Sequence, residues 1–280
     1  MNIQDVIRES VVALFSDNIL KRTLVLKGGT ALHLVEGIDT RLSTDIDFSV
    51  IDKIEDSDLY FSYVANALGT HFIKLGYEIF DTEYGRKPKE SAQAKPKFWA
   101  GWYFEFKLID SDLKPKNHES KRRFALVPDG AASSKIHLEI SEYEYCDSIE
   151  KIEIEGSLIT SYSTTLLILE KLRAICQQHP KYPHGKPKNR ARDYFDIYQL
   201  LKKQHSRQQL YIALAHHLPK VFAAKEVPLD LLSGIFEPEF IAFQASHFTS
   251  VQITVKEKTE PFKFYLEQLR LLVADLDYLK

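Results

Sequence analysis

Lys27-Gly28-Gly29-Thr30-Ala31-Leu32 and Arg41-Leu42-Ser43-Thr44-Asp45-Ile46-Asp47-Phe48 are the two stretches that decide the fold of this chain. The apolar residues before the first stretch predict a short strand, and the paired glycines predict a tight turn into an amphipathic helix. The second stretch predicts a strand. Asp45 and Asp47 are two residues apart, so on a strand both side chains point to the same face. The predicted order is therefore strand, glycine turn, helix and acidic strand.

This order has a chemical meaning. Two carboxylates on one face repel each other unless a cation or hydrogen bonds compensate them. Carboxylate oxygens are ligands that Mg²⁺ prefers. Gly28 and Gly29 leave room for a phosphate near the backbone, and the amides that open the next helix point toward it. Either half alone is a common structural feature, but a phosphate-binding turn beside metal-binding carboxylates is what nucleotidyl transfer requires.

The composition sets the class of protein. A chain of 280 residues with 44% hydrophobic and 12% aromatic residues can bury one large core or two smaller ones. The net charge is only −2, so contact with nucleic acid must come from local basic patches. Cys146 and Cys176 are far apart and lack metal-ligand spacing, which favours free thiols in a reducing compartment. Without an evident signal peptide or membrane-length apolar run, the expected location is the cytoplasm.

The apolar spacing also predicts the coarse organisation. Helices are predicted over residues 3–20, 57–75, 163–178, 189–202 and 262–279, and strands over 24–26, 77–80, 98–109, 135–140 and within 151–160. The composition changes from mixed to mostly helical near residue 160. This change predicts two domains, residues 1–160 and 161–280.

The quoted strings resemble a known family. Gly-Gly-Thr-Ala-Leu followed by Arg-x-Ser-x-Asp-x-Asp-Phe resembles the AbiEii/AbiGii-type toxin nucleotidyltransferases, a branch of the DNA polymerase β superfamily. Glu170-Lys171-Leu172-Arg173-Ala174 and Arg190-Ala191-Arg192-Asp193-Tyr194-Phe195-Asp196-Ile197-Tyr198 extend the resemblance. It implies an α+β fold, in which a polymerase β-like nucleotidyltransferase domain has a mixed sheet with flanking helices. It also implies a mostly helical C-terminal domain that completes the active-site cleft.

A third carboxylate is expected beside Asp45 and Asp47, because two-metal phosphoryl transfer uses one near the attacking hydroxyl. Glu139 is the candidate for this third metal ligand: it lies on the polar side of a predicted strand, where the family usually supplies an acidic residue. An ordinary exposed strand glutamate is the structural alternative. Glu105 is the rival candidate.

The resemblance also implies a lysine on one helix and an acidic residue on the next, both facing the nucleotide. Lys171 and Asp193 match these two positions. A lysine near the charge that develops on a triphosphate can stabilise the transition state. The alternative is an exposed helix lysine, with Asp193 and Asp196 capping the helix or pairing with Arg190 and Arg192.

Further contacts to the triphosphate are expected from the residues around the two motifs. Gly28 and Gly29 are predicted to bind it through the backbone. Arg41 and Ser43 either touch the triphosphate or hold their loop, and Thr30 binds phosphate or caps its helix. No zinc-binding histidine pattern, serine-nucleophile elbow or Walker-type loop is present in the sequence.

Basic loops occupy residues 86–97, 114–123 and 181–190. They either grip an RNA backbone, with Tyr182 stacking on a base, or are solvated connections.

The resulting hypothesis is a Mg²⁺-dependent nucleotidyltransferase, with two ions expected and an NTP as substrate. The resemblance implies transfer to the 3′ end of tRNA by the toxin of a phage-defence type toxin–antitoxin system, with a cognate antitoxin protein as partner. Two alternatives stay open: transfer to a small molecule such as an aminoglycoside, and a catalytically silent NTP-binding interaction module. Intact Asp45, Asp47 and Lys171 count against the silent module.

Overall fold

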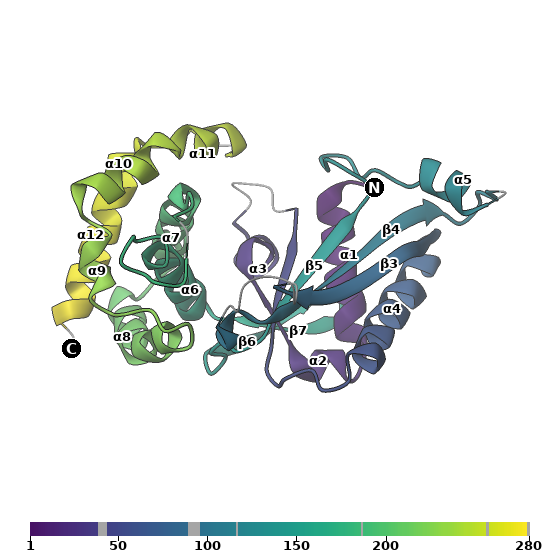
Figure 1. Cartoon of the computed structure of the whole chain (residues 1–280), viewed down its shortest axis with the longest axis horizontal. Coiled ribbons are helices and arrows are strands. Elements are labelled where there is room, and N and C mark those ends of the chain that lie inside the picture. The colour runs from purple at the N-terminus through teal and green to yellow at the C-terminus, as the bar shows by residue number, and fades with distance from the viewer. Residues whose placement is uncertain (39–43, 89–95, 116, 186, 256–257, 279–280) are drawn as a thin grey trace. The chain divides into compact units, whose positions relative to one another are not determined.

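The computed structural model describes residues 1–38, 44–88, 96–115, 117–185, 187–255 and 258–278 (Figure 1). The chain divides into two compact units. The first is built mainly from Met1–Gly37, Ser43–Tyr143 and Glu150–Ser161, and the second mainly from Glu144–Ile149 and Tyr162–Lys280. The first unit carries the sheet, and the second consists largely of helices.

One mixed sheet organises the first unit. Its seven strands are β1 (Leu24–Lys27), β2 (Ile46–Val50), β3 (Tyr77–Lys87), β4 (Gly101–Asp110), β5 (Ile136–Ser141), β6 (Ile149–Ile154) and β7 (Ser157–Tyr162), in the order β3-β4-β5-β2-β1-β7-β6. Strand β1 runs antiparallel to β2 and parallel to β7, and β2 runs parallel to β5. The predicted α+β fold with a mixed sheet and flanking helices is confirmed.

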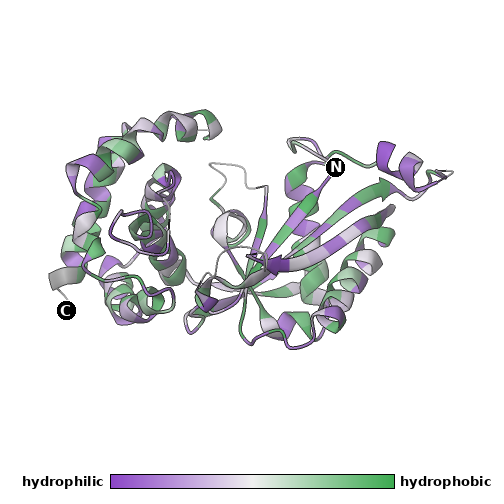
Figure 2. Ribbon diagram, in the orientation of Figure 1, coloured by the Kyte–Doolittle hydropathy of each residue, from purple (hydrophilic) through white to green (hydrophobic). Residues whose placement is uncertain are grey.

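The core of this unit lies between one face of the sheet and the helices α1 (Ile3–Ser16) and α4 (Ser57–Lys74). Aromatic contacts mark the packing: Phe15 against Phe48, Phe61 against Phe104 and Phe72 against Phe106. Hydrophobic and hydrophilic residues alternate along β4 and β5 (Figure 2), so the opposite face of these strands is polar. That polar face carries the candidate site.

Several elements differ from the predicted ranges. The helix predicted over residues 3–20 is divided into α1 and α2 (Leu20–Thr23), and a 3₁₀ turn, η1 (Lys97–Trp99), precedes β4. Strand β3 extends through Lys87, into a segment predicted as a loop. The predicted basic loop at 114–123 contains a short helix, α5 (His118–Arg123), because the Asn117 side chain caps it by accepting a hydrogen bond from the Ser120 amide.

The second unit contains the helices α6 (Thr164–Cys176), α7 (Ala191–Lys203), α8 (Arg207–Ala223), α9 (Leu231–Gly234), α10 (Pro238–Ser246), α11 (Phe248–Thr254) and α12 (Phe262–Tyr278). As predicted, Ser163 caps α6 by accepting a hydrogen bond from the Leu166 amide. Helix α6 packs against α7 and α8, and α12 packs against α7. Among the helices of the described chain, none combines the length and apolar character that a membrane span requires.

Candidate active site

The glycine turn and the acidic strand are in direct contact. Lys27, at the end of β1, lies opposite Asp47 of the antiparallel strand β2. Gly28 follows with a φ of +65°, and a Cβ at this position would lie 2.3 Å from Asp47 Oδ2. Only glycine satisfies both conditions, because other residues strain at positive φ and would displace the carboxylate. The two halves of the predicted motif therefore form one local structure.

Asp45 is held at the start of the same strand. It lies immediately before β2, not within the strand as predicted, and its backbone carbonyl accepts a hydrogen bond of 2.8 Å from Thr30 Oγ1. Thr30 is buried at the third residue of α3 (Gly28–Leu34), so the prediction that it caps this helix is wrong. Its hydroxyl instead ties the glycine-turn helix to the acidic segment. Arg41 and Ser43 lie outside the described residues.

Glu139 is the neighbour of Asp47 on the adjacent strand. Strand β5 pairs with β2 in a parallel register that places these two residues side by side, so their side chains share the polar face. Glu105 lies one strand further from Asp47, where it pairs with His137. The geometry therefore favours Glu139 over Glu105 as the third carboxylate.

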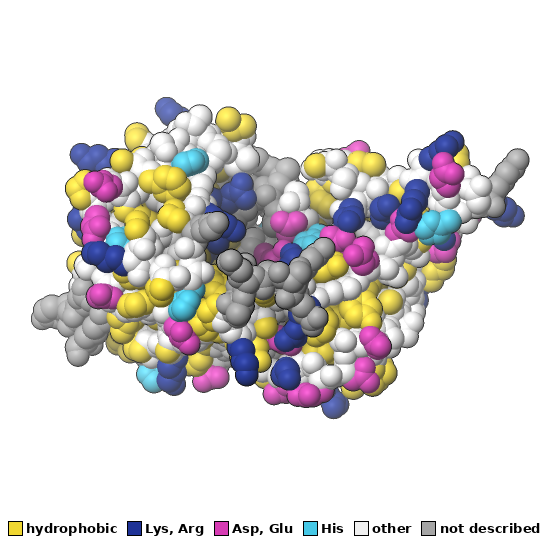
Figure 3. Space-filling model, viewed as in Figure 1, with side chains coloured by type: hydrophobic (Ala, Val, Ile, Leu, Met, Phe, Trp, Pro, Cys, Tyr) yellow, Lys and Arg dark blue, Asp and Glu magenta, His cyan; other side chains and the backbone are white. Residues whose placement is uncertain are grey.

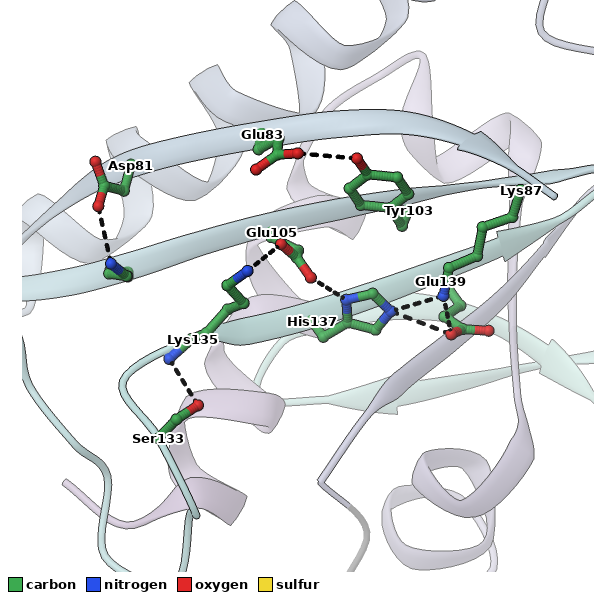
Figure 4. A network of polar contacts seen from close by, with 10 residues as sticks. Asp81, Glu83, Lys87, Tyr103, Glu105, Ser133, Lys135, His137 and Glu139 are labelled. Atoms are coloured by element: carbon green, nitrogen blue, oxygen red, sulfur yellow. Dashed lines mark hydrogen bonds and ion pairs between the residues drawn. The ribbon is translucent and has the colours of Figure 1, made fainter. Parts of the chain in front are cut away.

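A network of polar contacts surrounds Glu139 (Figure 4). His137 Nε2 lies 3.1 Å from Glu139 Oε1, and Lys87 Nζ contacts the same oxygen. The hydrogen bond from His137, reinforced by Lys87, outweighs burial and lowers the pKa of Glu139 to about 2. In turn, the hydrogen bond to Glu139 raises the pKa of His137. Glu139 is therefore ionised throughout the physiological pH range.

The network continues away from Asp47. His137 Nδ1 lies 3.0 Å from Glu105 Oε1, and Lys135 Nζ lies 2.6 Å from Glu105 Oε2. Among the described residues, His137 and Lys87 both contact Glu139 through Oε1, so Oε2 is the atom that we assign to a cation or an acceptor hydroxyl. His137 was not among the predicted site residues. The alternation of the strand could have identified it, because this pattern places residues 137 and 139 on the same polar face.

Lys27 is a second residue that sequence reasoning missed. Its side chain is buried, with 7% of the residue exposed, and Nζ donates a hydrogen bond of 3.1 Å to Ser141 Oγ. The lysine precedes the glycines, an order that excludes a Walker-type loop. Its place opposite Asp47 becomes visible only from the strand register. A buried cation thus shares the sheet face with the candidate carboxylates.

The carboxylates at this site have the chemistry of ligands to a divalent cation. Asp45, Asp47 and Glu139 offer the hard oxygen donors that Mg²⁺ prefers. Among the described residues, no group of three or more His, Cys, Asp or Glu side chains forms a preassembled metal site. The carboxylates of Asp45 and Asp47 and the Oε2 atom of Glu139 are suitable ligands for Mg²⁺. The binding of two ions stays a prediction.

The second motif forms a buried ion cluster within the helical unit. Lys171 Nζ, on α6, lies 3.0 Å from Asp193 Oδ1 and 2.6 Å from Asp196 Oδ2, both on α7. The exposed fractions of these side chains are 9%, 11% and 1%, respectively. The alternative of an exposed helix lysine is therefore wrong. Arg190 also approaches Asp193, at 3.7 Å.

Parts of two basic segments make contacts within the fold, and residues 89–95 of the third lie outside the described residues. Tyr182 is buried, with 2% of the residue exposed, and its hydroxyl donates a hydrogen bond of 2.8 Å to the Lys225 carbonyl. The prediction that Tyr182 stacks on a base is therefore wrong. In α5, Lys121 and Arg122 form ion pairs with Glu78 and Asp81 of β3. Basic and acidic side chains are interspersed over the face drawn in Figure 3.

The mixed sheet, the glycine turn and the adjoining carboxylates define a protein of the nucleotidyltransferase fold. The family profile described as "Nucleotidyl transferase AbiEii toxin, Type IV TA system" matches residues 11–268. The chain therefore belongs to this family, as its sequence motifs predicted. A search of curated proteins gave no match.

Solved structures show the same fold. JHP933 from Helicobacter pylori is 20% identical with a TM-score of 0.53, and the match covers 99% of this chain and 93% of that one. A candidate nucleotidyltransferase from H. pylori is 19% identical with a TM-score of 0.51, covering 99% of this chain and 96% of that one. At these identities the likeness concerns the fold alone.

Proposed function

We propose that this protein transfers a nucleotide from an NTP to the 3′ end of an RNA, with tRNA as the expected acceptor. One observation carries the proposal: the Asp47 carboxylate lies directly against the Gly28 turn, and Glu139 lies beside Asp47 in register. This adjacency supports the proposal that the turn binds the triphosphate and that the carboxylates hold a cation. Membership in a toxin family supports the further proposal that an antitoxin protein neutralises the activity.

In the proposed reaction, an acceptor hydroxyl attacks the α-phosphorus and gives its proton to solvent, a new P–O bond forms, and the bond to pyrophosphate breaks. Asp45, Asp47 and Glu139 would hold Mg²⁺, which supplies charge neutralisation for the triphosphate when bound. A carboxyl with a pKa near 2 accepts protons poorly at neutral pH, so we assign Glu139 to holding charge rather than to general-base catalysis.

The remaining candidates act on the triphosphate. Gly28 and Gly29 let its oxygens approach the backbone, and Thr30 holds the Asp45 segment against the same turn. Arg41 and Ser43 are proposed as further contacts. Lys171 is proposed to stabilise the charge that develops on the phosphates, and its two aspartate partners fix the position of its ammonium group.

Label transfer tests the proposal. Purified protein is incubated with Mg²⁺, each α-³²P-labelled NTP in turn and total cellular RNA. Asp47→Ala removes the central carboxylate, and Asp52→Ala is the matched control at an exposed aspartate just beyond the same strand. We expect label in tRNA-sized RNA from the native chain and from Asp52→Ala, but not from Asp47→Ala. Absence of label in RNA with all four NTPs would contradict RNA transfer, and label on an added aminoglycoside would identify the alternative acceptor class.

A further inference from the structure

An aromatic surface lies on the polar face of the sheet next to Glu139. Tyr103 of β4 pairs in register with Glu139 of β5, so the two side chains share one face. The ring of Tyr103 is nearly parallel to that of His137, with centroids 6.2 Å apart and an interplanar angle of 15° (Figure 4). Nothing in the proposed chemistry at Asp47 uses this pair of rings.

The position of the Tyr103 ring is fixed by its neighbours on β3. Gly85 lies opposite Tyr103, and a Cβ on Gly85 would lie 2.8 Å from the ring carbon Cε1. The absence of a side chain there gives the ring room to lie over the strand. The Tyr103 hydroxyl donates a hydrogen bond of 3.0 Å to Glu83. The ring is therefore held against the sheet and does not turn freely in solvent.

Two lysines flank the rings. Lys87 Nζ lies 5.9 Å from the centroid of Tyr103, and Lys135 bonds to Glu105 at the other end of the network. The side chains of the two lysines are 41% and 50% exposed. Proteins bind single-stranded nucleic acid through partly exposed aromatic rings, on which bases stack, and through cations that meet the phosphates. Here both lysines also pair with carboxylates, Lys87 with Glu139 and Lys135 with Glu105, so the rings carry the proposed contact.

The aromatic surface lies at a distance from Asp47 that the base of an acceptor nucleoside can span. Tyr103 is two strands from Asp47 through β5, a distance of about 10 Å at the usual spacing of strands. A nucleoside with its hydroxyl near Asp47 can extend its base over this distance. Glu83 and Glu105 supply hydrogen-bond acceptors for amino or ribose hydroxyl groups.

We propose that Tyr103 and His137 form the stacking surface for the terminal nucleoside of the RNA acceptor. The inference rests on the proposed function and specifies where the acceptor binds. The separate KM values for RNA and for NTP test whether Tyr103 binds the acceptor and not the NTP.

Direct binding tests the assignment without catalysis. A short single-stranded RNA with 2-aminopurine at its 3′ end is titrated with the full chain in EDTA, because stacking quenches this base. We expect quenching by the native chain and by Tyr103→Phe, which keeps the ring. Tyr103→Leu should lose the quenching and raise Kd about tenfold or more, the scale of one stacked base. Tyr84→Leu, on the opposite face of the same strand pair, should bind as the native chain does.

The outcomes separate this inference from the proposed function. No binding by the native chain, or equal binding by Tyr103→Leu, would overturn the stacking surface. The thermal unfolding of each variant identifies any that fails to fold. If Tyr103→Leu does not fold, His137→Leu removes the other ring, and quenching equal to that of the native chain would overturn the stacking surface. In the label-transfer assay, Tyr103→Leu should raise KM for RNA about tenfold, with kcat and KM for NTP within twofold. Tyr103-dependent RNA binding without label transfer would contradict the function and support the binding site.

Discussion

Gly28→Ala should inactivate the protein through a geometric effect on Asp47. The new Cβ would lie 2.3 Å from Asp47 Oδ2, whereas ordinary contact begins at 3.4 Å, so the carboxylate must move by about 1 Å. A misplacement of this size at a reacting centre can lower the rate about 100-fold. The alanine would also adopt a φ of +65°, which costs about 1 kcal/mol of folding free energy.

Gly37→Ala separates the two effects. Gly37 has a φ of +58°, and a Cβ there meets no atom within 4 Å. Both variants should therefore lose about 1 kcal/mol of unfolding free energy in urea from the positive φ, with a further loss in Gly28→Ala from the clash, but only Gly28→Ala should lose label transfer. Rates are compared under saturating NTP, with Asp47→Ala as the inactive reference. If Gly28→Ala keeps a rate within threefold of Gly37→Ala, the reasoning that Gly28 positions a catalytic Asp47 is refuted.

Two further predictions concern charge. Lys171→Met leaves Asp193 and Asp196 without that buried cation, so urea denaturation should show a loss of about 3–5 kcal/mol. Replacing both aspartates by asparagine in the Lys171→Met chain should recover most of the lost unfolding free energy. A loss below about 1 kcal/mol in Lys171→Met alone would contradict the burial of this ion cluster. Glu139, with a pKa of about 2 against 4.5, stabilises the fold fully above pH 4.5, and this contribution is lost as pH falls through 2. His137 has its pKa raised from 6.5, so its contribution is complete below 6.5 and is lost as pH rises through the raised value. In Glu139→Gln, Tm should therefore depend less on pH at both the acidic and the alkaline end. An unchanged dependence would contradict a stabilising contact between Glu139 and His137.

The local parts of this structure could be predicted from the sequence because they depend on residues close together in the chain. Alternation identified the strand at 135–140, and the serine at position 163 predicted the start of α6. The glycine turn and the acidic strand follow from two motifs with a fixed order. Each of these features requires only short-range periodicity or capping chemistry.

The remaining features depend on strand pairing and tertiary packing. Glu139 meets Asp47 because β5 pairs with β2, although β3 and β4 intervene in the sequence. The β1–β2 and β2–β5 pairings together bring Lys27 onto the face that Ser141 occupies. Tyr182 shows the opposite case. Its loop is polar and basic, but its ring is buried and its hydroxyl bonds to a distant carbonyl. Composition cannot show whether a side chain reaches the site, as Lys27 does, or is buried elsewhere, as Tyr182 is, because both depend on contacts between distant segments.

Several of the candidate carboxylates contact cationic side chains of the protein itself. The sequence alone predicts that a cation or hydrogen bonds offset Asp45 and Asp47. In the structure, Glu139 already contacts His137 and Lys87, and Lys171 offsets two aspartates of the helical unit. The buried Asp193 and Asp196 therefore have a protein cation that makes their burial tolerable during folding, whereas Glu139, whose side chain is 44% exposed, is held at the sheet surface by its two partners. Mg²⁺ would act at Asp45 and Asp47 together with the reacting phosphates, which fits a site built to bind its cation together with the substrate.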